Sequence, residues 1–289
     1  MQILFHIGAH ATDQGLLIRS ILRNRGDLSK EGIIVPGPSR YRELIGNVST
    51  TLRGEPASSD TEELLLEAIG DDDHAERIVL SNEHFLCRDS VVLSEEGLYP
   101  KAQKSAWLRN CFPSHDVEFA IALRNPATLV PDILARLPEE EQASALERLQ
   151  LERLRWLDVI IDIAASNPET PLLVWCHEEA PFIWGDLIRE LTAHDPSTRL
   201  VGDTDMLEQL MSHDGVSKLS DFLESQGSVT REQRIQAITA FLDAHAAEDL
   251  EAEIDLPGWT ADTVRQISND YDEDIAAIAE INTVTMVRA

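Results

Sequence analysis

Residues 3–18 constrain the fold of this chain more than any other stretch. Residues 2–7 form a short apolar run with β-branched and aromatic side chains, which is typical of an interior parallel strand. Gly8 permits a tight turn, and apolar residues then recur at helical spacing from Leu16 to Leu22. A strand, a loop and a helix in this order predict an α/β domain. Its first loop would meet the free N–H groups at the start of the helix, where anions bind readily.

Further strands are expected wherever short apolar runs end in glycine, proline or polar residues. These runs lie at residues 32–35, 77–84, 117–123, 171–176 and 199–202. Helical patterns separate them, and the longest covers residues 139–166. The alternation predicts an α/β fold: a doubly wound parallel sheet of about five strands, with helices on both faces.

The last part of the chain is expected to be wholly helical. Its helical patterns cover residues 204–225, 229–247 and 260–280. A chain of 289 residues is long enough for one large α/β domain. We therefore expect a single domain over 1–289, with 1–203 as the sheet-bearing core and 204–289 as a helical C-terminal extension.

The chain is strongly acidic. It has 52 aspartates and glutamates against 24 lysines and arginines, which gives a formal net charge of −28. Such a surface repels DNA, RNA and sulfated polymers, so we expect no nucleic-acid partner and a small-molecule substrate or acceptor. The excess of acid over lysine is also common in proteins from salty environments, where salt screens the repulsion.

Other features of the sequence bear on location and assembly. No run approaches the roughly 20 apolar residues of a membrane helix, so no membrane partner is expected. The N-terminus enters a predicted strand without the pattern of a signal peptide, which favours a cytoplasmic location. Cys87, Cys111 and Cys176 are few, odd in number and widely spaced, as buried free thiols are. The sequence leaves a homodimer open.

The stretch FHIGAHATDQGLLI, residues 5–18, resembles the opening of P-loop sulfotransferases, particularly bacterial proteins similar to heparan sulfotransferases. Their loop typically reads His-Ile-Gly-x-x-Lys-Thr-Gly-Thr-Thr and holds the 5′-phosphosulfate of the donor 3′-phosphoadenosine 5′-phosphosulfate. The residues that match are His6, Ile7, Gly8 and Thr12, whereas Ala11 stands at the lysine position and residues 13–15 read Asp-Gln-Gly. The resemblance implies donor-binding positions at Gly8, Ala9, Ala11 and Thr12.

Two later segments resemble further parts of that family. VLSNEHF, residues 79–85, is similar to a strand that ends in Ser-x-Glu, whose glutamate deprotonates the acceptor hydroxyl, and Glu83 is the matching residue. The run 117–123 followed by Arg-x-Pro resembles the signature whose arginine and later serine hold the 3′-phosphate. Arg124 matches that arginine, but Asp132 stands at the serine position. The candidate catalytic residues are therefore Glu83 and, in the loop, His10; Arg124 and Asp132 are candidate donor-binding positions.

Three functions remain open from the sequence. The first is a divergent sulfotransferase that transfers a sulfuryl group from 3′-phosphoadenosine 5′-phosphosulfate to a small hydroxyl or amine acceptor. The second is a non-catalytic member of the fold that acts as a binding or interaction protein. The third is a different, metal-assisted enzyme that uses the same strand-end cleft.

The third function depends on polar residues at or just beyond predicted strand ends. These residues are His6, His10, Glu83, His84, His177, Glu178 and Glu179. Histidine together with carboxylate suits zinc or another divalent ion. Their spacing matches no closed metal signature, so the sequence names no metal ligand.

Overall fold

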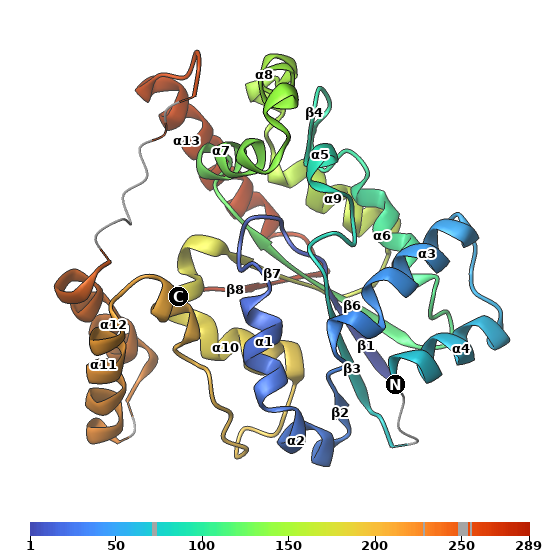
Figure 1. Ribbon diagram of the computed structural model, residues 1–289, viewed down its shortest axis with the longest axis horizontal. Coiled ribbons are helices and arrows are strands. Elements are labelled where there is room, and N and C mark those ends of the chain that lie inside the picture. The colour runs from blue at the N-terminus through green and yellow to red at the C-terminus, as the bar shows by residue number, and fades with distance from the viewer. Residues whose placement is uncertain (71–73, 228, 248–253, 255) are drawn as a thin grey trace.

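A computed structural model describes residues 1–70, 74–227, 229–247, 254 and 256–289. At its centre is a parallel sheet of six strands in the order β2-β3-β1-β6-β7-β8 (Figure 1). The strands of this sheet are β1 (Gln2–His6), β2 (Ile33–Ile34), β3 (Arg77–Ser81), β6 (Asp116–Leu123), β7 (Leu172–Cys176) and β8 (Val284–Val287). A separate antiparallel pair joins β4 (Leu93–Ser94) and β5 (Gly97–Leu98).

The strands are apolar on both faces, as a buried parallel sheet requires. Along β1, Ile3 and Phe5 point to one face and Leu4 points to the other, and all three are at most 1% exposed. Phe5 is in register with Leu80 of β3 and Phe119 of β6. The central strand is thereby buried on both faces and both edges.

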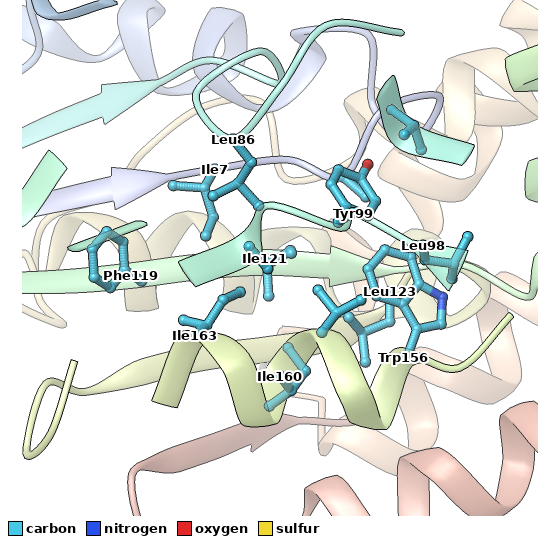
Figure 2. Close-up of a cluster of buried hydrophobic side chains, with 14 of the residues drawn as sticks. Ile7, Leu86, Leu98, Tyr99, Phe119, Ile121, Leu123, Trp156, Ile160 and Ile163 are labelled. Carbon is cyan, nitrogen blue, oxygen red and sulfur yellow. The ribbon is translucent and has the colours of Figure 1, made fainter. Parts of the chain in front are cut away.

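Two layers of helices cover the sheet (Figure 1). The helices on the first face are α3 (Arg42–Leu52), α4 (Ser59–Ile69), α5 (Asp89–Val92), α6 (Ser105–Arg109), α7 (Pro126–Arg136), α9 (Trp156–Ser166) and α13 (Ala261–Ile278). Those on the second face are α1 (Leu16–Arg23), α2 (Arg25–Leu28) and α10 (Ala180–Thr192). Figure 2 shows the first-face core, where Ile160 and Ile163 of α9 pack under Ile121 of β6.

The helices α11 (His213–Gln226) and α12 (Arg231–His245) form a pair with a small core of their own. Leu219 of α11 and Ile238 of α12 are both fully buried there. The short helix η6 (Asp205–Gln209) joins this core through Leu207, and Phe182 of α10 packs against it. The pair is thus attached to the second face of the sheet through α10.

The α/β fold expected from the sequence, with a parallel sheet and C-terminal helices, is confirmed, but the strand set differs. Residues 199–202 form no strand, and Val201 is 60% exposed. The place beside β7 is taken by β8, which pairs in parallel from Leu172↔Val284 to Trp175↔Val287. The run Val284-Thr285-Met286-Val287 suits a strand better because two of its residues are valine and one is threonine. The C-terminal part is therefore not wholly helical, and the strand count is six rather than about five.

The helix expected over 139–166 is divided in two. The helix α8 (Glu139–Arg148) ends before Leu149, which has extended backbone, and α9 begins only at Trp156. The Trp156 indole N–H donates to the Arg124 carbonyl at 2.7 Å, and its side chain is fully buried. Tertiary packing of this tryptophan fixes the start of α9, although the apolar periodicity runs through the break. Within the described residues, no helix is both long enough and apolar enough to cross a bilayer.

The chain turns in different directions at the carboxyl ends of three neighbouring strands. After β1 it passes to α1 on the second face, whereas after β3 and β6 it passes to α5 and α7 on the first face. In open parallel sheets, such a divergence creates the crevice in which ligands bind. The loop that follows β1 therefore has one crevice on each side of it.

Candidate functional site

The loop after β1 is shaped by a glycine that no other residue could replace easily. Gly8 has φ 120°, and a Cβ atom on it would lie 3.6 Å from the Glu83 Cα. The backbone conformation favours glycine, whereas the distance to Glu83 is that of an ordinary van der Waals contact. Gly8 thus brings the end of β3 directly against the loop.

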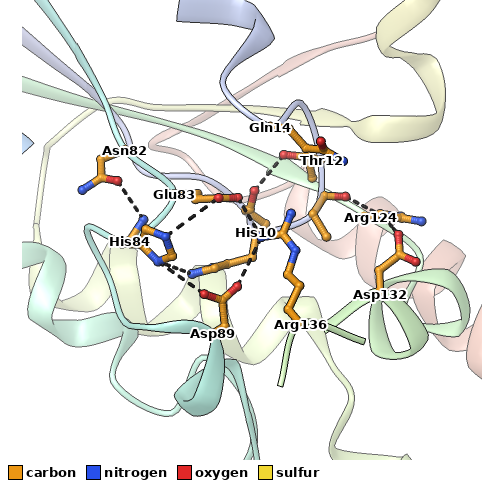
Figure 3. A network of polar contacts seen from close by, with 12 residues as sticks. His10, Thr12, Gln14, Asn82, Glu83, His84, Asp89, Arg124, Asp132 and Arg136 are labelled. Atoms are coloured by element: carbon orange, nitrogen blue, oxygen red, sulfur yellow. Dashed lines mark hydrogen bonds and ion pairs between the residues drawn. The ribbon is translucent and has the colours of Figure 1, made fainter. Parts of the chain in front are cut away.

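The crevice between β1 and β3 holds a cluster that we call the histidine flank: His10, Glu83, His84, Asp89 and Arg136 (Figure 3). His10 Nε2 lies 3.2 Å from His84 Nδ1, and that atom lies 3.8 Å from Asp89 Oδ2. One nitrogen or oxygen atom from each of His10, His84 and Asp89 falls within 4.8 Å of the other two. Two imidazoles and a carboxylate therefore converge on one point.

Local structure fixes the histidine that follows β3. The Asn82 N–H donates to the His6 carbonyl at 3.0 Å, which continues the pairing of β3 with β1. The Asn82 side-chain oxygen then accepts the His84 N–H at 3.2 Å, as in an Asx turn. A strand end and a short turn thereby direct His84 toward the loop.

Tyr99 holds His10 from the other side. Its hydroxyl accepts the backbone N–H of His10 at 2.8 Å and lies 2.9 Å from His10 Nδ1. Tyr99 is 1% exposed, and burial raises its pKa well above the ordinary value. The hydroxyl therefore stays protonated. Because Nδ1 is engaged by Tyr99, the other ring nitrogen, Nε2, faces His84.

Arg136, in the last turn of α7, joins the two carboxylates of the histidine flank. Its Nη1 lies 3.3 Å from Glu83 Oε2 and 3.2 Å from Asp89 Oδ1. Burial is the largest single influence and raises the pKa of Asp89, but the hydrogen bond from Arg136 and the charges of His10, His84 and Arg136 together leave that pKa lowered. Asp89 is therefore ionised, with its second oxygen directed to His84.

His10 is neutral at pH 7. Burial lowers the pKa of His10 to about 4, against the attraction of Asp89. A neutral imidazole has one nitrogen with a free lone pair, and such a nitrogen can accept a proton or bind a metal ion.

The crevice between β1 and β6 has a different composition. We call the cluster there the arginine flank: Ala11, Thr12, Asp13, Arg124 and Asp132 (Figure 3 labels Thr12, Arg124 and Asp132). Arg124 Nη1 donates to the Ala11 carbonyl at 2.5 Å and to Asp132 Oδ2 at 2.6 Å. Thr12 donates its hydroxyl to the Ala9 carbonyl at 2.7 Å. The polar side chains of this flank are thus paired with one another or with the backbone of the loop and of α1.

The start of α1 is engaged by an acidic side chain of the loop. Asp13 Oδ2 accepts the Leu17 N–H at 2.8 Å, and the Asp13 carbonyl accepts the Leu16 N–H. Asp13 is 8% exposed. A carboxylate at a helix N-terminus interacts with the same N–H groups that an anionic ligand would use.

These contacts fit the donor 3′-phosphoadenosine 5′-phosphosulfate poorly. Asp13 lies at the helix start, where the resemblance implies the 5′-phosphosulfate. Asp132 pairs with Arg124, the arginine that the resemblance assigns to the 3′-phosphate. The backbone N–H groups of Ala9 and His10 donate to Ala122 and Tyr99. Two carboxylates would have to move, or be neutralised, before a phosphate could bind in their place.

Among the remaining strand-end residues, His6, Glu178 and Glu179 make contacts outside both flanks. His177 lies near the arginine flank: burial is the main cause that lowers its pKa, and the charge of Arg124 lowers it further. His6 Nδ1 is 2.9 Å from the Ser81 hydroxyl, and the ring packs on Trp175. Glu178 accepts the Asn125 N–H and the Tyr271 hydroxyl, and Glu179 pairs with Arg288 near the end of the chain. These contacts hold elements together, so Glu178 and Glu179 are structural residues.

The three cysteines are free thiols, as the sequence predicts. Burial raises the pKa of Cys87 and of Cys111 to about 12, and that of Cys176 to about 11. All three thiols are therefore protonated at pH 7. None has the thiolate character of a catalytic cysteine.

Sequence reasoning missed three members of the site. Asp89 and Tyr99 follow no strand of the main sheet, and no local pattern marks them. Arg136 closes a helix whose last turn favours a basic residue for electrostatic reasons alone. These residues reach the site only through the packing of α5, β5 and α7.

In comparisons with known proteins, the chain matches no family model and no curated protein. The function proposed for it therefore depends on the contacts of its own residues.

Proposed function

We propose that the chain is a metal-dependent enzyme in which His10, His84 and Asp89 bind one divalent cation. The observation that carries this proposal is the convergence of their three ligand atoms within 4.8 Å. In a tetrahedral zinc site with bonds of about 2.0–2.1 Å, neighbouring ligand atoms lie about 3.4 Å apart. The separations of 3.2 Å between the histidines and 3.8 Å from His84 to Asp89 are close to that distance.

Each of the three ligands also has a polar neighbour on its outer side, which for His10 and Asp89 lies within hydrogen-bond distance. Tyr99 engages His10 Nδ1, Arg136 engages Asp89 Oδ1, and Glu83 Oε1 lies 3.9 Å from His84 Nε2. Metal-bound histidines nearly always have a partner on the second ring nitrogen, which fixes the tautomer and the ring orientation. Here the partner atoms and the ligand atoms lie on opposite sides of each group, as a metal site requires.

Three protein ligands leave one coordination position for water or substrate, as in catalytic zinc sites. An ion bound there would lower the pKa of its water to about 7 and supply a nucleophile for hydrolysis. Glu83 acts through His84 as a positioning residue, and Arg136 fixes both carboxylates. The acidic surface disfavours a polyanionic substrate, so we propose a small neutral or cationic one.

Calorimetric titration with zinc, after treatment of the protein with a chelator, tests this proposal. We expect one zinc ion per chain, with affinity reduced more than about 100-fold in His10→Ala and Asp89→Asn. His213→Ala is the matched control, because His213 is exposed at the start of α11. A panel of chromogenic esters and phosphodiesters, with and without zinc, then reports the activity. Zinc binding that survives both variants would place the ion elsewhere and refute the site.

Sulfuryl transfer to a small hydroxyl or amine acceptor is our second candidate function. The contact that favours it is the hydrogen bond from Arg124 to the Ala11 carbonyl. This bond places Arg124 beside the loop. The resemblance assigns Arg124 to the 3′-phosphate of the donor and the loop to its 5′-phosphosulfate. A cytoplasmic location and a homodimer stay predictions under either function.

Titration with 3′-phosphoadenosine 5′-phosphate separates the two functions. If the chain is a transferase, the nucleotide binds, Arg124→Ala weakens it, and Asp132→Ser strengthens it by removing the competing carboxylate. If the chain is a metal-dependent enzyme, the nucleotide gives no heat while zinc does. A protein that binds neither would be the non-catalytic member of the fold.

A further inference from the structure

A cavity lies away from both flanks, between α10, α12 and the segment 194–203. Its volume is about 490 Å³, within the range of small-molecule pockets, and it contains no residue of the histidine flank. The apolar part of its wall comes from Phe182, Ile188, Leu200, Val201 and Val229. The sheet-bearing part and the α11–α12 pair meet here, because α10 packs on the sheet and α12 on α11.

The cavity is positively charged in a chain that is otherwise acidic. Its wall carries four arginines against two aspartates: Arg189, Arg199, Arg231, Arg234, Asp186 and Asp203. Asp186 is shared between Arg189 at 2.9 Å and Arg231 at 3.5 Å, and Asp203 pairs with Arg234 at 2.8 Å. Among the described residues, no carboxylate lies within ion-pair distance of the remaining arginine, Arg199. The cavity therefore has a formal excess of two positive charges.

The start of α12 adds to this field. Thr230 caps the helix through a capping box with Gln233, and both Thr230 and Arg231 line the cavity. The positive end of a helix of 15 residues thus faces the same space as the arginines. Guanidinium groups bind phosphate through paired hydrogen bonds, and an apolar wall beside them suits a ring or a short carbon skeleton.

We propose that this cavity binds a small phosphate-bearing metabolite, with the phosphate at Arg199 and Arg231 and its apolar part against Phe182 and Val201. The charge excess of two matches a phosphomonoester dianion. Because α10 and α12 belong to different cores, a bound ligand would link them and raise the thermal stability of the whole chain. This proposal does not depend on the metal site.

Thermal-shift and calorimetric titrations of the full chain test the proposal with three probes: adenosine 5′-monophosphate, inorganic phosphate and adenosine. We expect the nucleotide to bind most tightly, phosphate more weakly, and adenosine not at all within the same concentration range. Arg199→Ala and Arg231→Ala should each weaken the nucleotide about 10- to 100-fold, as expected for loss of a charged hydrogen-bond donor.

Arg265→Ala is the matched control, because it removes the same charge from an exposed position on α13. Arg199 is exposed and makes no ion pair within the described residues, so its replacement leaves the fold intact. An equal loss of nucleotide affinity in Arg265→Ala would show that only the net charge of the chain matters, and would refute the site. No stabilisation by any phosphate probe would refute it as well. Zinc titration of the same variants shows separately whether the metal site persists.

Discussion

The two flanks of the loop after β1 differ in how their polar groups are paired. In the arginine flank, Arg124 and Asp132 bind each other, Thr12 binds the backbone of the loop, and Asp13 binds the start of α1. In the histidine flank, the outer atoms of His10 and Asp89 are held by Tyr99 and Arg136, while their inner atoms face His84. Groups that bind only one another stabilise the fold. Groups whose outer atoms are bound by neighbours, and whose inner atoms converge on one point, are arranged to bind a ligand.

The largest effect that tests this comparison is expected for His84→Ala. The variant removes a ligand whose side chain is 45% exposed and whose one hydrogen-bond contact with His10 is only partly buried. Zinc affinity should fall more than about 100-fold. The free energy of unfolding without metal should fall by no more than about 1 kcal/mol, the contribution of the lost hydrogen bond to His10. Calorimetry and urea denaturation measure the two quantities, and a large loss of stability without loss of zinc binding would reverse the assignment of the flanks.

Tyr99→Phe tests whether the outer partners matter. It removes the hydroxyl that engages His10 Nδ1, and we expect zinc affinity to fall about 10- to 100-fold. Tyr41→Phe is the matched control, because it removes an equally buried hydroxyl that bonds the Ser81 backbone at the same strand edge. Both variants lose stability through unpaired buried groups, but only Tyr99→Phe should weaken zinc. Equal zinc affinity in the two variants would contradict the role of Tyr99.

Arg124→Ala should show the opposite behaviour to His84→Ala. It removes a donor that ties the loop to α7, and we expect a loss of about 2 kcal/mol in the free energy of unfolding. Zinc affinity should not change. Asp132→Ala serves as the comparison, because its exposed half of the ion pair contributes about 0–1 kcal/mol. If zinc binding is lost with Arg124, the two flanks form one site rather than two.

The smallest effect concerns His6, at the end of β1 beneath both flanks. Burial lowers the pKa of His6 from its ordinary value of 6.5, so the folded protein binds fewer protons there than the unfolded chain. The contribution of His6 to stability is therefore complete above the unfolded pKa and decreases as the pH falls below it. Urea midpoints between about pH 7.5 and pH 5 should decrease less in His6→Asn than in the wild type. Parallel curves would show that the pKa of His6 is the same in the folded and the unfolded protein, which would contradict this prediction.

Much of the fold follows from local sequence because the strands near the N-terminus are short, apolar and sharply ended. The runs that became β1, β3, β6 and β7 could be read directly, and so could the change to a helix after Gly8. The strand β8 could not, because Val284–Val287 follows a long helix and resembles many exposed segments until β7 pairs with it. The segment 199–202 was predicted as a strand on the same kind of pattern. The two segments compete for one sheet edge, and the β-branched residues of Val284–Val287 suit it better.

Of the candidate site, only the residues that follow strand ends could be predicted from the sequence. His10, Glu83 and His84 were all expected at the carboxyl edge, and the structure places them together. The sequence could not separate them from His177, Glu178 and Glu179 at the end of β7, of which Glu178 and Glu179 have other partners. Asp89, Tyr99 and Arg136 arrive from segments that are distant along the chain. Their positions depend on tertiary packing, which leaves no local pattern.

The position of β8 has a consequence for how the chain is made. β7 is separated from β8 along the chain by everything from α10 to α13, so its outer edge has no strand beside it until that whole stretch has left the ribosome. An unpaired edge of a hydrophobic strand is a template for association with other chains. Ribosomes that stall within α11–α13 would therefore release aggregation-prone chains, and a truncation that removes residues 284–287 would leave the finished protein in the same condition.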